Sequence, residues 1–270
     1  MVISSVDFCE NNYVILPFIA EFHNAWSSLV LCFLGYIGYA YGNVTKEYRY
    51  DVMFILLGVV GFGSFLLHAT LHHLGQSADE LPMLWINLAL LYGLIELRAP
   101  FGKPKIKKLP QLMVMYAFLQ TAFYFHYRSF YWVFLVSYTS LVIIIILWLM
   151  KLVWKDYKEN YTAKCLFMSA FFSYVVIGSL LWIFEMNNCD DLLPYYRNAF
   201  HLSFHILWHF GAGLGTYLTM TLLVYLRLLA LAETPYNKQY VALNMKFGFL
   251  PVCTILPFNI KPPKDQTKVS

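Results

Sequence analysis

Long apolar segments dominate the sequence and limit what it can fold into. Seven of them approach or exceed the length of about 20 residues that a helix needs to cross the hydrocarbon core of a bilayer. Charged residues make up only 13% of the chain, against about 25% in typical soluble domains. The sequence therefore predicts an all-α membrane protein, a seven-transmembrane helix bundle without a separate soluble domain. The expected spans are 24–42, 52–72, 79–97, 109–127, 129–150, 165–185 and 201–229.

Basic residues lie almost entirely on one side of this predicted topology. Of the 19 Lys and Arg residues, all but Arg128 and Arg197 fall after the first, third or fifth segment, or at and beyond the end of the seventh. Because basic residues are enriched in cytosolic loops, we expect a lumenal or extracellular N-terminus, with residues 230–270 forming a cytosolic tail. The net charge of +4 belongs to this cytosolic side, and we expect no nucleic acid as a partner.

Titratable residues from three distant segments fall at one predicted membrane level. His68 lies near the end of the second segment, Asp79 begins the third, and His201, His205 and His209 lie at the start of the last. Such groups are costly within a membrane and tend to be functional. Histidines four residues apart on a helix share a face and can bind one metal ion. The pairs 201/205 and 205/209 are equally spaced, and spacing alone does not choose between them.

A third imidazole, from His68, would complete a three-histidine set, which is the open arrangement of a catalytic zinc site. Ser64 lies one turn before His68 and would face the same cavity. Asp79 would be near enough to act as general base toward a water molecule activated there. A hydrogen-bonded structural role is the alternative for each histidine taken singly. A transmembrane haem carrier is a further alternative, but its histidines would occupy both halves of the membrane.

Three separated motifs resemble the alkaline ceramidases, seven-span membrane amidases of the superfamily that includes the adiponectin receptors. The motifs are DFCENNYVILPFIAEFHN (7–24), GSFLLHATLHH (63–73) with DELPM (79–83), and FHILWHFGAGLGTY (204–217). The resemblance implies that His68, His205 and His209 bind zinc, with His201 outside the set. It also implies that Asp79 is the catalytic acid and base, and that Ser64 holds the substrate carbonyl or its oxyanion.

The resemblance further implies a calcium site in a lumenal segment, residues 1–23, together with the start of the first span. Carboxylate and amide oxygens are the ligands that Ca²⁺ prefers, whereas composition alone would also allow a solvated acidic segment. Phe8 would contribute only its backbone carbonyl. The implied calcium ligands are Asp7, Phe8, Glu10, Asn12 and Glu21.

A disulfide between Cys9 and Cys189 is also implied by the family, and it would tie this segment to the end of the sixth span. Glu185 stands where relatives often have an aspartate, and its role stays open.

The implied activity is hydrolysis of the ceramide amide bond to a sphingoid base and a free fatty acid. The expected substrates are ceramide, phytoceramide or dihydroceramide, which an apolar bundle in the lipid bilayer suits. The resemblance places the protein in the endoplasmic reticulum or Golgi membrane, and we infer no obligate protein partner. An adiponectin-receptor-like protein with residual ceramidase activity is the alternative. The short acidic N-terminal segment counts against it, because such receptors would carry a substantial cytosolic N-terminal domain.

Overall fold

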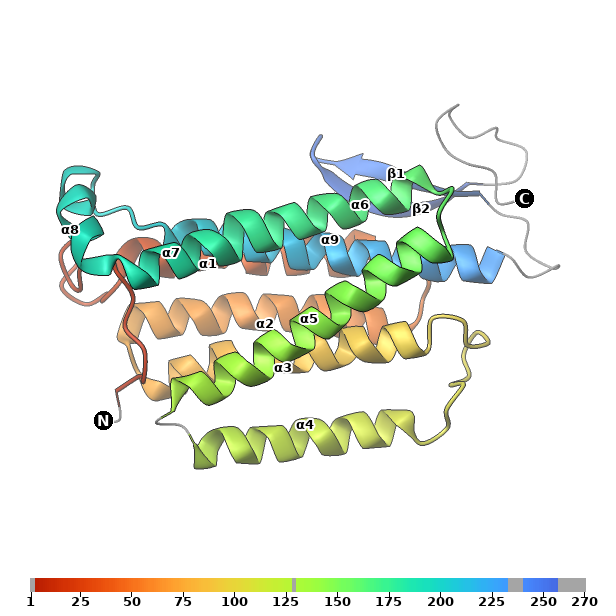
Figure 1. The fold of residues 1–270 in the computed structure, drawn as a ribbon, viewed down its shortest axis with the longest axis horizontal. Coiled ribbons are helices and arrows are strands. Elements are labelled where there is room, and N and C mark those ends of the chain that lie inside the picture. The colour runs from red at the N-terminus through yellow and green to blue at the C-terminus, as the bar shows by residue number, and fades with distance from the viewer. Residues whose placement is uncertain (1–2, 128–129, 233–239, 257–270) are drawn as a thin grey trace.

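A computed structural model describes residues 3–127, 130–232 and 240–256, and within them the chain is mostly helical (Figure 1). Each predicted apolar segment overlaps one long helical stretch. Two of these stretches contain π-helical turns, η1 and η2, and α6, η2 and α7 follow one another without a break. The elements are α1 (Phe22–Ile37), η1 (Gly38–Gly42), α2 (Tyr48–Thr70), α3 (His73–Ile95), α4 (Leu109–His126), α5 (Tyr131–Lys155), α6 (Tyr161–Phe171), η2 (Phe172–Leu180), α7 (Leu181–Asn187), α8 (Cys189–Asn198), α9 (His205–Ala232), β1 (Tyr240–Lys246) and β2 (Leu250–Leu256).

Among the residues that the structure describes, five helices are long and apolar enough to cross a membrane, which is the make-up of a multi-pass membrane protein. They are α2, α3, α5, the continuous stretch Tyr161–Asn187 and α9. The stretches at α1 and α4 are not among these five. Several boundaries differ from the predicted spans by four to six residues, and two of these lie near the candidate site: α3 already begins at His73, and α9 begins only at His205.

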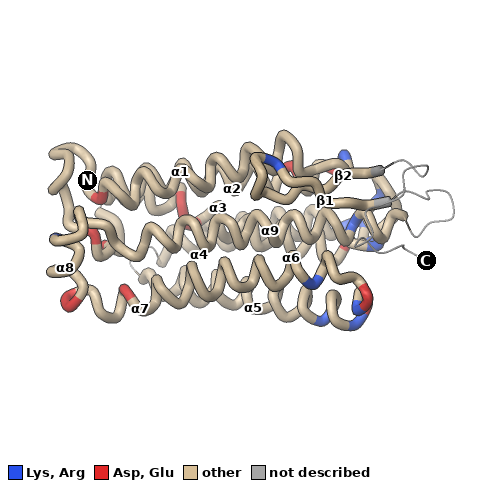
Figure 2. Tube along the Cα trace, turned by 90° about the horizontal axis from the view of Figure 1, so that it is seen from above, with Lys and Arg blue, Asp and Glu red and all other residues tan. Residues whose placement is uncertain are grey.

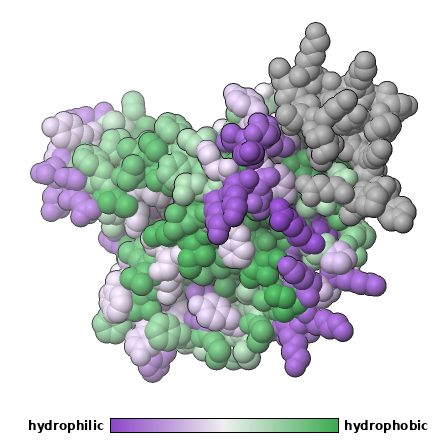
Figure 3. Space-filling view, turned by 45° about the vertical axis from the view of Figure 1, so that its right-hand side comes forward, coloured by the Kyte–Doolittle hydropathy of each residue, from purple (hydrophilic) through white to green (hydrophobic). Residues whose placement is uncertain are grey.

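The two ends of the bundle carry different elements and different charges. The N-terminal segment and α8 lie at one end, called here the α8 end, and the strands lie at the other, called the hairpin end (Figure 1). Figure 2 shows most of the described Lys and Arg residues at the hairpin end. Figure 3 shows hydrophilic side chains on the side that comes forward and also at the far left, with a largely apolar surface between them. Arg128, Lys238, Lys261, Lys264 and Lys268 lie outside the described residues.

A two-stranded antiparallel hairpin departs from the all-α expectation. It pairs Val241 with Ile255 and Lys246 with Leu250, in a part of the chain that we predicted only as a tail. Gly248 adopts φ +80° in the turn, a conformation that costs glycine little. The Tyr217 hydroxyl of α9 donates to the Pro251 carbonyl over 3.0 Å, which fixes the hairpin on the central helix.

Helix α9 is the centre of the bundle and contacts α1, α2, α6 and η2. Tyr217, Met220, Leu222 and Val224 on this helix are fully buried. Helix α4 lies at the edge (Figure 1), and only its Leu109 and Tyr124 are buried. The polar groups described below are therefore carried mainly by the best-packed helices.

Two glycines allow the helices that carry the candidate site to approach each other closely. A Cβ atom at Gly63 of α2 would lie 2.1 Å from the Ala78 carbonyl oxygen of α3, and one at Gly211 of α9 would lie 2.5 Å from the Gly178 nitrogen of η2. Any side chain at these positions would push the helices apart. The contact at Gly63 brings the neighbouring Ser64 close to Asp79.

Candidate metal centre

Three buried histidines come together near the α8 end of the bundle. His68 lies in the last turn of α2, and His205 and His209 lie one turn apart at the start of α9. Their exposed fractions are 0%, 2% and 2%, and one ring nitrogen from each lies within 4.8 Å of the others. Three nitrogens in this arrangement are the ligand set of a zinc ion that keeps a fourth position open.

His201 lies apart from this cluster. It precedes α9, adopts φ +62°, and its Nδ1 atom is 3.3 Å from the Asn11 side-chain nitrogen. The structure therefore selects the pair 205/209 from the two that spacing alone left open.

The outer nitrogens of two of these histidines are held by neighbouring side chains. His68 Nδ1 is hydrogen-bonded to Glu21 Oε2, and His209 Nδ1 lies 2.7 Å from Ser27 Oγ. Such partners orient metal-bound histidines and fix which nitrogen faces the ion. Neither Glu21 nor Ser27 was predicted to hold a histidine.

Two ring nitrogens of the cluster have unmet hydrogen-bonding capacity. Within the described part of the chain, His68 Nε2 and His205 Nδ1 are buried without a hydrogen-bond partner. Leaving a buried polar atom unpaired costs about 1–3 kcal/mol. A metal ion bound by these nitrogens would remove that cost, so the residues present fit one.

Ser64 and Asp79 lie beside the cluster. Ser64 Oγ is 3.4 Å from His209 Nε2 and is also a hydrogen-bond partner of the Asp79 carboxylate. Both residues line a cavity of about 920 Å³ empty volume that His209 also reaches and that continues along apolar side chains such as Ile145 and Leu222. A second cavity, of about 750 Å³, meets the first at Asp79 and also reaches His205.

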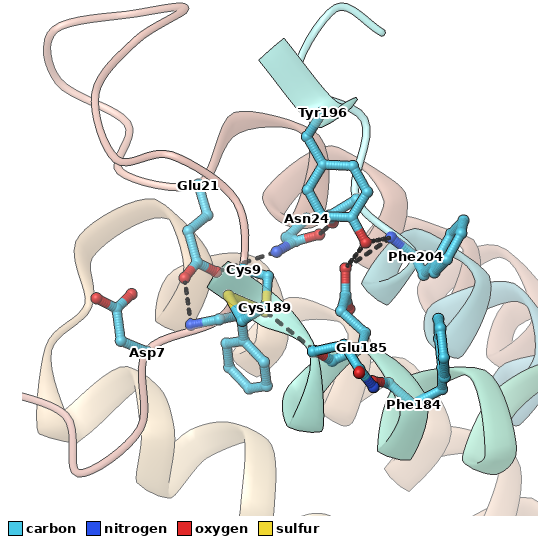
Figure 4. Close-up of a disulfide and its surroundings, with 12 residues drawn as sticks. Asp7, Cys9, Glu21, Asn24, Phe184, Glu185, Cys189, Tyr196 and Phe204 are labelled. Carbon is cyan, nitrogen blue, oxygen red and sulfur yellow. Dashed lines mark hydrogen bonds between the residues drawn. A yellow bond between two sulfur atoms is a disulfide. The ribbon is translucent and has the colours of Figure 1, made fainter. Parts of the chain in front are cut away.

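The predicted calcium ligands gather partly as expected. Asn12 Nδ2 donates to both Asp7 carboxylate oxygens at 3.3 Å, and the Glu21 carboxylate lies near that of Asp7 (Figure 4). Burial raises the pKa of Glu21 to about 7 and, with the nearby Glu21 side chain, raises the pKa of Asp7. Two carboxylates held side by side in this way are suited to a cation.

Glu10 and Phe8 have contacts that we did not predict. The two Glu10 carboxylate oxygens accept hydrogen bonds from the His23 and Asn24 backbone nitrogens at 2.7 and 2.8 Å, at the start of α1. The Phe8 ring lies over the histidine cluster, with its centroid 4.9 Å from that of His68 and 4.1 Å from that of His205. Phe8 thus shields the histidines as well as donating its backbone N–H to Glu21 Oε1 at 2.9 Å.

The Cys9–Cys189 disulfide is confirmed, with a Cα–Cα distance of 5.5 Å (Figure 4). It joins the N-terminal segment to α8, beside Glu185. The fully buried Glu185 accepts from the Tyr196 hydroxyl at 2.7 Å and from the Phe204 backbone nitrogen at 2.8 Å. Since Phe204 directly precedes His205, Glu185 holds the start of α9, where a carboxylate also interacts favourably with the helix dipole.

Comparison with known proteins identifies similar chains along nearly the whole length. The ceramidase family model matches residues 1–254. Alkaline ceramidase 3 of Mus musculus is 30% identical over 247 residues, which cover 87% of this chain and 88% of the mouse protein. An alkaline ceramidase of Arabidopsis thaliana is 26% identical over 267 residues, covering 98% of this chain and 96% of the plant protein.

Proposed function

The chain belongs to the ceramidase family, and we propose that it is a zinc-dependent membrane amidase that hydrolyses the amide bond of ceramides. The observation that carries this proposal is the buried three-histidine cluster beside Asp79 and Ser64, at the meeting point of two largely apolar cavities. Apolar walls suit a substrate with two long hydrocarbon chains, and the polar groups stand where an amide between those chains would lie.

His68, His205 and His209 would hold the zinc ion, with Glu21 and Ser27 fixing two of the imidazoles. Zinc bound in such a site polarises a carbonyl group and lowers the pKa of a water molecule. Asp79 would accept a proton from the attacking water and deliver it to the leaving amine. The Ser64 hydroxyl would donate a hydrogen bond to the carbonyl oxygen as negative charge develops on it.

Hydrolysis would add one water molecule across the amide bond. The water oxygen bonds to the acyl carbon, the carbon–nitrogen bond breaks, and the nitrogen leaves with the proton that Asp79 carries. The products are a free fatty acid and a sphingoid base. Ceramide, phytoceramide and dihydroceramide share this amide and are all candidate substrates.

The proposal includes a seven-span topology, in which α1 with η1, and α4, cross the membrane together with the five more apolar stretches. The concentration of basic residues at the hairpin end supports a cytosolic position for that end. The α8 end, with the metal centre and the disulfide, would then face the lumen of the endoplasmic reticulum or Golgi, where disulfides persist.

We also propose that Asp7, Glu10, Asn12 and Glu21, with the Phe8 carbonyl, bind calcium. The adjoining carboxylates of Asp7 and Glu21 support this assignment. Glu21 would then link the two sites, because one of its oxygens is hydrogen-bonded to the proposed zinc ligand His68. Calcium would be structural or regulatory, acting through the position of this one carboxylate.

Purified protein incubated with a panel of ceramides tests the proposed activity. Release of fatty acid is expected, and His205→Ala should abolish it together with the bound zinc found by elemental analysis. His126→Ala is a matched control, because this exposed histidine of α4 lies outside the cluster. Equal turnover by the His205→Ala and His126→Ala proteins would refute the proposed site.

A further inference from the structure

A cleft at the hairpin end lies far from the metal centre and is lined by cations and aromatic rings. It is formed by the segment that leads into α2 and the loop that follows α3, and its empty volume is about 800 Å³. Its lining residues include Lys46, Arg49 and Lys103, with Tyr48, Tyr92 and Phe101. Tyr48 and Phe101 are 85% and 59% exposed. Exposed aromatic rings beside basic side chains are typical of the membrane–water interface.

The acidic groups around this cleft already have partners. Glu47 also lines it, but Arg227 binds both of its carboxylate oxygens at 2.8 and 2.9 Å, and Arg49 approaches them at 2.9 Å. The Glu96 carboxylate accepts from the Lys105 and Ile106 backbone nitrogens. Asp51 accepts from Asn43.

The basic groups that line the cleft still have binding capacity left. Lys46 and Lys103 form no ion pair with the residues that the structure describes. The Arg49 side chain is only 10% exposed, and its Nε has no hydrogen-bond acceptor within the same residues. A buried guanidinium N–H without an acceptor is a ready partner for an anionic oxygen. The first turn of α2, which begins at Tyr48, adds the positive end of a helix dipole.

A largely apolar groove continues from the cleft. It runs between the end of α9 and the hairpin, is lined by Val44, Leu228, Val241 and Ile255, and shares Phe101 with the cationic cleft. An anion site and an apolar groove that meet at one aromatic ring match a molecule with an anionic head and a hydrocarbon chain.

We propose that this composite site binds an amphiphile carrying a phosphate group, with the phosphate between Lys46, Arg49 and Lys103 and the chain over Phe101. This inference goes beyond ceramide hydrolysis and does not depend on it. A bound anionic lipid would link the loop before α2 to the loop after α3, and so stabilise the hairpin end of the enzyme in an anionic membrane.

Binding of lysophosphatidic acid to the full chain in phosphatidylcholine nanodiscs tests the proposal. Lysophosphatidylcholine, with the same chain and a zwitterionic head, is the ligand control. The double variant Lys46→Gln/Lys103→Gln should weaken binding of lysophosphatidic acid by about five-fold for each lysine. Lys158→Gln removes an exposed lysine at the same end and should leave the affinity unchanged, since Lys158 lies outside the cleft.

Three outcomes would overturn the proposal. Equal affinity for the two lysolipids would show that the phosphate is not recognised. An equal loss of affinity in Lys158→Gln and in the double variant would indicate unspecific attraction to basic loops. The third outcome combines two results: inorganic phosphate displaces the lysolipid completely, and Phe101→Ala binds the lysolipid as tightly as the wild type. Together they would show that the site binds free phosphate and does not recognise the hydrocarbon chain. Unchanged thermal unfolding of the double variant will show that lost binding does not reflect lost structure.

Discussion

The buried Arg227–Glu47 pair at the hairpin end and the histidine cluster at the α8 end differ in how far their hydrogen bonds are satisfied. At the hairpin end, the 1%-exposed Arg227 donates to both oxygens of Glu47 and to the Leu97 and Ala99 carbonyls. At the α8 end, His68 Nε2 and His205 Nδ1 have no partner in the described part of the chain. The histidines are as deeply buried as Arg227, so burial alone does not explain the difference.

The contrast separates a structural cluster from a ligand-binding one. A buried ion pair whose hydrogen bonds are complete holds elements together, here the segment before α2, the loop after α3 and α9. A buried cluster with unpaired nitrogens that converge is stable only if something else binds them. Changes in the Arg227–Glu47 pair should therefore alter stability, whereas changes in the histidine cluster should alter metal binding and catalysis.

Asp79→Asn should produce the largest effect. The amide cannot accept a proton from water, so we expect ceramide hydrolysis to slow by about 10²–10⁴-fold. Zinc content should stay the same, because Asp79 is not one of the three ligands. Asp156→Asn, which alters an exposed carboxylate at the hairpin end, is the control. Steady-state rates and elemental analysis of the same samples measure both effects, and near-normal turnover by Asp79→Asn would exclude this residue as the base.

Arg227→Met should lower the stability of the fold and leave zinc binding unchanged. Removing Arg227 leaves the Glu47 carboxylate paired with Arg49 alone, so the loss should be at most the cost of breaking a buried pair, about 3–5 kcal/mol of the free energy of unfolding. Reversible unfolding in detergent measures this loss. Zinc per folded chain should not change. A variant that unfolds normally but has lost zinc would contradict the division of roles between the two ends.

Glu21→Gln should weaken zinc binding without removing it. The amide still reaches His68 but no longer offers a carboxylate to the imidazole, and loss of such a partner lowers metal affinity by about 10–100-fold. Competition with a chelator, at one fixed calcium concentration, measures the affinity. Asp190→Asn is the control at the same end of the bundle, since Asp190 is exposed in the first turn of α8 and belongs to neither proposed metal site. Equal zinc affinities of the two variants would show that Glu21 does not support the zinc site.

The effect of pH on the free energy of unfolding is the smallest change that we predict for the Arg227–Glu47 pair. Hydrogen bonds from Arg227 and Arg49 outweigh burial and lower the pKa of Glu47. The stabilisation that the ionised Glu47 contributes is therefore complete above its unfolded-state pKa of about 4.3. It is lost as the pH falls through the lower pKa that Glu47 has in the folded state. Unfolding of the wild type should weaken with acid more steeply than that of Glu47→Gln, and parallel curves would contradict the assignment.

Most of the helical architecture could be predicted from the sequence, because apolar segments of membrane length leave few alternatives. The hairpin could not, since the short run of Tyr240–Lys246 has no signal that distinguishes a strand from an ordered tail. Its register depends on packing against Tyr217 of α9. The family resemblance supplied the Cys9–Cys189 disulfide, which spans 180 residues of sequence and which spacing could not provide.

At the candidate site, spacing predicted that the histidines share a level but left His201 and His209 equivalent. The choice depends on where α9 begins, and that in turn depends on Glu185, which holds the Phe204 nitrogen from another helix. The contacts of Glu21 with His68 and of Ser27 with His209 were missed for the same reason. A side chain that supports a ligand across helices has no periodic signature.

X-ray diffraction at the zinc absorption edge, from crystals of the purified chain, tests the central claim most directly. The account predicts one anomalous peak per chain about 2.0–2.1 Å from a ring nitrogen of each of His68, His205 and His209, and none at the Arg227–Glu47 cluster. A chain that hydrolyses ceramide in the crystallisation buffer but shows no anomalous peak among these histidines would contradict it.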